Sequence, residues 1–96
     1  MREIDANLIT NVVAELCIKA NKILPNDLVE CIGKCKLNES NKTAENVLSD
    51  LEANIDAAKE LNIPVCQDTG MAVIFAEIGQ DVHIVNGSFE TAVNDG

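Results

Sequence analysis

The fold is set largely by residues 43–64, which read TAENVLSDLEANIDAAKELNIP. Apolar side chains recur here every three or four residues, which is the spacing of one face of an α-helix. They are Ala44, Val47, Leu48, Leu51, Ile55, Ala58 and Leu61. Thr43 is expected to cap this helix, because a threonine hydroxyl can accept a hydrogen bond from a first-turn N–H group. Asn62-Ile63-Pro64 is expected to end it, because the residue before a proline avoids the helical conformation.

Two further helices are predicted upstream. Residues 5–20 carry an apolar stripe at the same spacing, with Asp5 as the capping residue. Pro25 suits the first turn of a second helix that ends near residues 37–38. Polar residues 39–42 then form a connection. The chain up to Pro64 is therefore predicted to be mostly helical.

The pattern changes after Pro64. Residues 71–78, MAVIFAEI, form a nearly continuous apolar run that is typical of a buried strand. Residues 82–85, VHIV, are predicted to be a second strand, and Ser88 is expected to cap a short final helix. The sequence thus predicts an α+β fold in which a helix-rich first part is followed by short strands. Because the last helix has barely two turns, the chain is expected to be part of a larger α+β domain.

Charge and composition exclude several classes of function. The chain has 96 residues and a formal net charge of −9, so it lacks the basic face that nucleic acids and anionic membranes require. It has no apolar run of about 18 residues, and its polar N-terminus does not resemble a signal peptide. A cytoplasmic location is expected, where cysteines are thiols or metal ligands rather than disulfides. The only arginine, Arg2, is expected at a frayed terminus, so the cationic contacts of an anionic substrate must come from elsewhere.

The chemically richest segment is residues 66–70. Here a thiol, an amide, a carboxylate, a hydroxyl and a glycine follow one another in a predicted loop: Cys66, Gln67, Asp68, Thr69 and Gly70. Loops next to rigid elements often carry functional groups. However, Asp-Thr-Gly is also an ordinary turn sequence, and cysteine often serves as a small buried apolar residue. From these residues alone, a structural and a functional role both stay open.

A resemblance to a known family favours the functional role. Residues 64–75, PVCQDTGMAVIF, and residues 77–84, EIGQDVHI, closely resemble the signature of the class I fumarase and L-tartrate dehydratase α-subunit family. The Ala20-Asn21 and Leu24-Pro25 pairs upstream are also similar to that family. The resemblance covers nearly all of the chain and is sharpest from Cys66 to Gly70 and in the apolar run that follows.

The resemblance implies a reaction and a cofactor. Family members hold a 4Fe-4S cluster through three cysteines, and the fourth iron acts as a Lewis acid that binds the substrate. The implied reaction is reversible hydration of a four-carbon dicarboxylate: fumarate to (S)-malate, with L(+)-tartrate dehydration as the alternative. The implied roles are metal ligand for Cys66 and substrate contacts for Gln67 and Asp68. Asp68 also takes a catalytic role in handling the proton.

The same resemblance implies that the site is incomplete in this chain. The other two cluster cysteines and the substrate-binding arginines are expected beyond residue 96. The catalytic base is expected in a fused C-terminal domain or a separate β subunit, within an oligomer. Residues 1–96 are thus expected to be the truncated N-terminal part of the α-subunit domain, inactive alone.

A reading of a different class also stays open. In it the chain is a non-catalytic helical interaction module whose cysteines are structural or bind zinc. Cys31 and Cys35 lie four residues apart, on one face of a predicted helix. Because they flank Gly33 in an apolar stripe, they and Cys17 are expected to be core or incidental thiols. His83 is expected to pack or form a hydrogen bond rather than act as a base.

Overall fold

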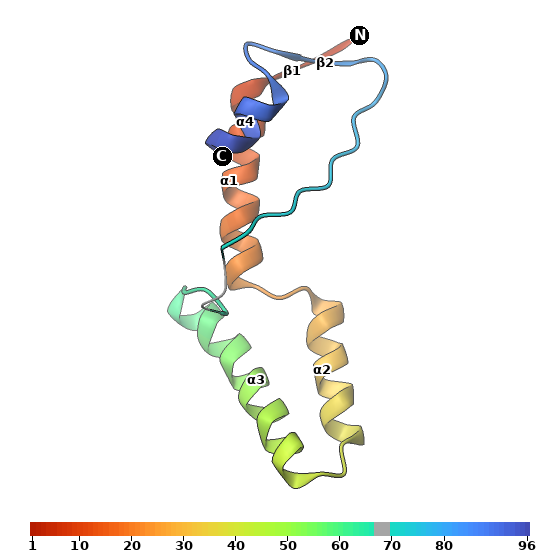
Figure 1. Ribbon diagram of the computed structural model, residues 1–96, viewed down its shortest axis with the longest axis vertical. Helices are drawn as coiled ribbons and strands as arrows, with labels where there is room; N and C mark the ends of the chain where they lie inside the picture. The colour runs from red at the N-terminus through yellow and green to blue at the C-terminus, as the bar shows by residue number, and fades with distance from the viewer. Residues whose placement is uncertain (67–69) are drawn as a thin grey trace. The chain divides into compact units, whose positions relative to one another are not determined.

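The computed structural model covers residues 1–96 and describes residues 1–66 and 70–96 (Figure 1). Along the chain the elements are β1 (Arg2–Asp5), α1 (Ala6–Lys22), α2 (Asn26–Asn38), α3 (Lys42–Leu61), β2 (Val82–Val85) and α4 (Phe89–Asp95). The helices outweigh two strands of four residues each, which confirms the predicted α+β class. The chain divides into two compact units: Met1–Ile18 with Gly70–Gly96, and Lys19–Thr69. None of the helices in the described ranges is both long and apolar enough to cross a membrane.

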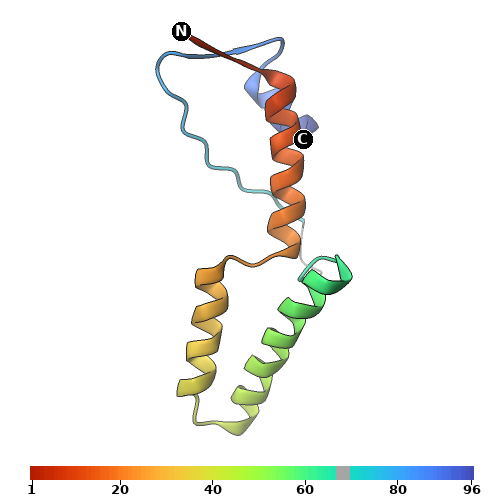
Figure 2. The same ribbon diagram turned by 180° about the vertical axis from the view of Figure 1, so that it is seen from behind.

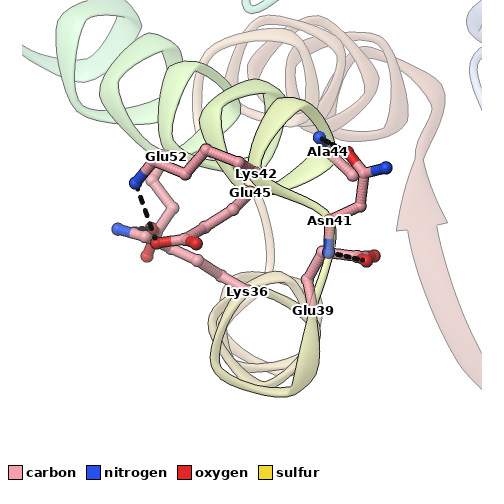
Figure 3. A network of polar contacts seen from close by, with 7 residues as sticks. All are labelled: Lys36, Glu39, Asn41, Lys42, Ala44, Glu45 and Glu52. Carbon is pink, nitrogen blue, oxygen red and sulfur yellow. Dashed lines mark hydrogen bonds and ion pairs between the residues drawn. The ribbon is translucent and has the colours of Figure 1, made fainter.

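In the unit Lys19–Thr69, α2 and α3 form a helical hairpin (Figure 2). The connection between them is held by Glu39, whose Oε1 accepts a hydrogen bond from the Asn41 N–H group at 3.0 Å (Figure 3). The same oxygen also accepts from the Ser40 N–H group at 3.1 Å. Lys36 Nζ lies 3.0 Å from Glu52 Oε1, but both side chains are 37% exposed. An exposed ion pair of this kind stabilises by at most about 1 kcal/mol. The buried residues of α3 must therefore contribute more to holding this unit together.

Both ends of α3 have clear physical causes. The prediction that Thr43 caps the helix is wrong, because Asn41 Oδ1 accepts the Ala44 N–H at 3.1 Å and α3 begins at Lys42. Asn41 has the extended backbone that a capping residue needs, and asparagine is a stronger cap than threonine. The predicted stop is confirmed. Asn62 adopts the left-handed conformation (φ 57°), and the N–H groups of Asn62 and Ile63 both donate to the Ala58 carbonyl.

The two upstream helices are confirmed with small shifts. α1 begins directly after Asp5, whose Oδ1 accepts the Asn7 N–H at 2.8 Å, so Asp5 is the predicted cap. Pro25 lies just outside α2 as its N-cap residue rather than in its first turn. α2 ends at Asn38, as predicted.

The second unit is built on a parallel pair of strands. β1 pairs with β2 in a register that runs from Arg2 opposite Val82 to Asp5 opposite Val85. β2 confirms the predicted strand at residues 82–85. The expectation of a frayed terminus around Arg2 is wrong, since the Arg2 N–H also donates to the Asp81 carbonyl at 2.8 Å. The partner of β1 lies about eighty residues along the chain, so no local pattern could reveal it.

Helix α4 packs on α1 through small side chains. Ala6, Val13 and Ala92 are buried, and Thr10 Oγ1 donates to the Ala92 carbonyl at 3.0 Å. A Cβ atom on Gly96 would lie only 2.7 Å from the Thr10 carbonyl oxygen, so this approach of the two helices requires a glycine. Ser88 is the predicted cap of α4: its Oγ accepts the Thr91 N–H at 3.2 Å.

The predicted strand at residues 71–78 is wrong. The structure assigns residues 70–79 to no helix or strand, and Figure 1 draws this segment as a plain trace. Its apolar side chains are exposed, with Met71 88%, Val73 69% and Phe75 94% exposed. A segment becomes a strand only when it forms hydrogen bonds to a neighbouring strand. In this structure β2 pairs with β1, and residues 71–78 are not paired. The apolar run is therefore extended chain without the pairing that its composition favours.

Asp5 links the strand pair to the turn after β2. Its pKa lies below the ordinary value of 3.8, first because Asn86 Nδ2 donates to Oδ2 at 2.7 Å and second because the Asn7 N–H donates to Oδ1. A lowered pKa means that folding favours the ionised carboxyl. Asp5 therefore stabilises the fold above pH 3.8, and this contribution is lost as the pH falls through the lowered pKa.

The substitution Asn86→Gly is expected to raise the pKa of Asp5 toward its ordinary value, because it removes the larger of the two donors. Glycine also accepts the positive φ of 64° at this position, so no backbone strain is added. An NMR titration of the Asp5 carboxyl in both proteins measures the change. The free energy of unfolding of the variant should also vary less with pH below 3.8. An identical Asp5 titration curve in the two proteins would show that Asn86 does not lower this pKa.

Candidate functional site

Cys66 lies a short distance beyond the end of α3. The helix stops at Leu61, Asn62 turns the chain, and residues 63–65 lead to the cysteine. The Cys66 side chain is exposed, so its sulfur can be reached from solvent. The cysteine thus lies on the chain that leaves α3, four residues after the Asn62 cap that ends the helix.

The residue before Cys66 is held on both sides. The Val65 N–H donates to the Asn21 carbonyl at 2.8 Å, and the Val65 carbonyl accepts from Asn54 Nδ2, also at 2.8 Å. Asn21 lies in the last turn of α1 and Asn54 in the middle of α3. Both peptide groups of Val65 are therefore tied to helices, which fixes the backbone position from which the Cys66 side chain departs.

The remaining residues of the predicted site give less structural information. Gln67 and Asp68, the predicted substrate contacts, and Thr69 lie outside the described residues. Gly70 is exposed, and a Cβ atom placed on it would meet no other atom within 4 Å. Crowding therefore does not explain the glycine at position 70.

The other three cysteines lie on different helices. Cys17 is half-buried on α1, whereas Cys31 and Cys35 are exposed on α2, so these two are not core residues. Within residues 1–66 and 70–96, no three side chains of His, Cys, Asp or Glu are placed to hold a metal ion together. An exposed thiol at position 66 fits one ligand of an iron–sulfur cluster, because such clusters bind through cysteine thiolates.

The two residues with other possible polar roles both lie on the strands. Arg2 is on β1, and His83 on β2 has an exposed side chain, opposite Glu3 in the register. The exposure of His83 contradicts a packing role, whereas the hydrogen-bonding role that the sequence offered beside it stays a prediction. Neither residue belongs to the unit that carries Cys66.

A pocket of about 270 Å³ lies in the unit Met1–Ile18 with Gly70–Gly96. Its lining consists of Ile4, Ile9, Ala76, Glu77, Ile78, Gly79, Val82, Ile84 and Phe89. Only Glu77 is charged, and a carboxylate repels another carboxylate. The pocket therefore suits apolar groups and does not suit a small diacid.

Sequence reasoning missed the two asparagines that hold Val65. Asn54 lies at the edge of the apolar stripe of the predicted helix, three residues after Leu51 and four before Ala58, and nothing near it in the sequence points to a contact with the loop. Asn21 belongs to a pair that supports the family resemblance, but nothing in its neighbourhood points to a role. Both contacts join residues far apart in the sequence, 11 residues for Asn54 and 44 for Asn21, so no local signal marks them.

Comparison with known proteins gives a consistent result. The model of the family described as "Fumarate hydratase (Fumerase)" matches residues 10–96. A protein of Methanocaldococcus jannaschii named "Putative L(+)-tartrate dehydratase subunit alpha" is 33% identical over 75 residues, which are 78% of this chain and 26% of that protein. The "L(+)-tartrate dehydratase subunit alpha" of Escherichia coli K12 is 29% identical over 73 residues, 76% of this chain and 24% of that protein. The chain thus spans about a quarter of the length of the curated relatives it matches. No solved structure matches it significantly.

Proposed function

This chain belongs to the fumarate hydratase (Fumerase) family, and on that premise we propose that it is the N-terminal part of an iron–sulfur hydro-lyase subunit. The reaction is the reversible addition of water to a four-carbon unsaturated dicarboxylate. The observation that carries the proposal is the family match over residues 10–96, within which an exposed thiol follows a rigid helix. The whole of residues 1–96 is assigned to one α-subunit domain.

Cys66 is proposed as a ligand of a 4Fe-4S cluster. The donor type supports this, because cysteine sulfur is the protein ligand that iron–sulfur clusters use, whereas the hydroxyl and amide groups that follow in the sequence are poor ligands for such clusters. When bound, the cluster supplies a Lewis-acidic iron that stabilises the departing or attacking hydroxide. Gln67 and Asp68 are proposed to orient the substrate, with Asp68 also accepting or donating a proton at the reacting carbon.

The rest of the site is proposed to come from other parts of the enzyme. Two observations support this: the chain spans about a quarter of the length of its relatives, and its sequence contains a single arginine, Arg2. The relatives are named as α subunits, which favours a β subunit, or a fused equivalent, as the partner. The cytoplasmic location and the oligomeric assembly expected from the sequence stay predictions.

The substrate is proposed to be fumarate or L(+)-tartrate. The family description favours fumarate, whereas the names of the relatives favour L(+)-tartrate. Both are small diacids of four carbons, and they differ in the hydroxyl groups that the completed site must recognise.

An activity assay tests the proposal. The complete enzyme that carries this sequence, purified without oxygen together with its partner subunit, is expected to hydrate fumarate or to dehydrate L(+)-tartrate. The chain of residues 1–96 alone is expected to do neither, because it lacks the other ligands and the cationic substrate contacts. Turnover by the 96-residue chain alone would contradict the proposal. So would a complete enzyme that is colourless, inactive on both diacids and loaded with zinc, as expected for a non-catalytic module.

A further inference from the structure

One side chain, that of Asn54, helps to hold the backbone directly before Cys66. Asn54 Nδ2 donates to the Val65 carbonyl at 2.8 Å, across eleven residues of sequence. The Val65 N–H is engaged at the same time by the Asn21 carbonyl, at 2.8 Å. Together the two bonds fix both peptide groups of the residue that precedes the cysteine.

Resting on the proposed function, we propose that Asn54 is a positioning residue for the cluster ligand Cys66. Asn54 lies inside α3, well away from both ends, so the hydrogen bonds of the helix fix its backbone. Through its hydrogen bond to the Val65 carbonyl, the Asn54 amide restrains the backbone next to Cys66. A ligand whose main chain is held in place loses little further freedom when it binds iron, and it re-forms its bond quickly after a transient break.

The contact is not needed for the fold of the helical hairpin. Asn54 is exposed, α3 has its own caps at Asn41 and Asn62, and the buried side chains of the helix are those of Ile55 and Ala58. A hydrogen bond in an exposed position contributes little net stability, because water replaces the lost partner. Losing it should therefore loosen the loop while leaving α3 intact.

The substitution Asn54→Asp gives a sharp test. It keeps the size of the side chain, removes the donor and places a carboxylate against the Val65 carbonyl oxygen, which repels it. Asn46→Asp is the matched control, since Asn46 is also exposed on α3 and the change of charge is the same. Asn54→Gln keeps an amide donor on a side chain one methylene longer.

The measurement is the rate at which a chelator removes iron from the complete enzyme under anaerobic conditions, together with the electron paramagnetic resonance spectrum of the reduced cluster. Partners that orient a metal ligand typically change metal affinity by about 10–100-fold. We expect Asn54→Asp to lose iron about tenfold faster than Asn46→Asp and to broaden the spectrum, with Asn54→Gln losing iron more slowly than Asn54→Asp. The urea unfolding midpoints of the two aspartate variants should agree.

Two other outcomes overturn different statements. Equal rates of iron loss in Asn54→Asp and Asn46→Asp would refute the role of Asn54 and leave the cluster assignment untouched. An unsubstituted complete enzyme that contains no iron–sulfur cluster would refute the proposed function, and the role of Asn54 with it.

Discussion

Replacing the proposed cluster ligand, Cys66→Ser, is expected to lower kcat/KM of the complete enzyme by about a thousandfold or more. A serine hydroxyl stays protonated near neutral pH and is a harder ligand than a thiolate, so the iron at that corner is lost. A metal acting as a Lewis acid contributes several kcal/mol to transition-state stabilisation, and each 1.36 kcal/mol corresponds to a factor of about ten in rate. Iron content and steady-state rates, measured on the same anaerobic preparation, check the prediction.

The matched control is Cys31→Ser. Cys31 is also exposed, but it lies on α2 and is not a predicted ligand. This variant should keep its iron, its visible absorbance and its rate. If the two serine variants behaved alike, whether both active or both inactive, position 66 would have no special role in holding the cluster.

The second large effect concerns stability. Ile55→Ala is expected to lower the free energy of unfolding by about 2–5 kcal/mol, the range found when a buried isoleucine or leucine is cut back to alanine. Ile55 is 8% exposed on α3, and the other buried apolar residues found in the described part of the chain are Ala6, Val13, Ala58 and Ala92. Ile55 is the largest of them, so cutting it back to alanine removes the most buried apolar volume that a single substitution at these positions can remove. Urea denaturation followed by circular dichroism measures the change.

Leu37→Ala serves as the control for this measurement. Leu37 is 86% exposed at the end of α2, and surface substitutions of this kind change stability by only about 0.5 kcal/mol in either direction. A loss of stability in Leu37→Ala as large as that in Ile55→Ala would mean that α3 does not bury the Ile55 side chain as described.

Helices could be predicted from this sequence because their determinants are local. The apolar spacing in residues 43–64 and the stop at Asn62 both lie within one or two turns of the residues that they affect. Even at the start of α3 the predicted capping residue is wrong by only two positions, Asn41 instead of Thr43. Both residues can cap a helix, and they lie within one helical turn of each other.

Strands could not be predicted as well, because a strand depends on a partner that local sequence does not show. β1 was missed since Arg2–Asp5 is short and mostly polar, and its partner β2 lies near the other end of the chain. Residues 71–78 have the composition of a buried strand, yet the structure leaves them unassigned and exposed. The composition of a segment shows that it favours a strand, but it forms one only where another strand is available for hydrogen bonding.

The candidate site shows the same division. Cys66 was singled out through the family resemblance of residues 64–75, not through spacing or burial, since no three His, Cys, Asp or Glu side chains among the described residues are placed to hold a metal ion together. Asn54 and Asn21 hold the residue before it, and only the three-dimensional arrangement reveals them. A sequence motif can thus point to a candidate ligand without revealing the groups that hold the neighbouring backbone in place.

Binding of iron by the sulfur of Cys66 is the proposal on which the assigned function depends. The most direct measurement replaces that single sulfur with selenium, by incorporating selenocysteine at position 66 of the complete enzyme, and records X-ray absorption at the selenium edge under anaerobic conditions. We expect an iron atom as a direct neighbour of the selenium, and we expect this iron neighbour to be absent after a chelator has removed the cluster. A selenium whose only close neighbours are carbon, in an enzyme that still contains its cluster, would contradict the assignment of Cys66 as an iron ligand.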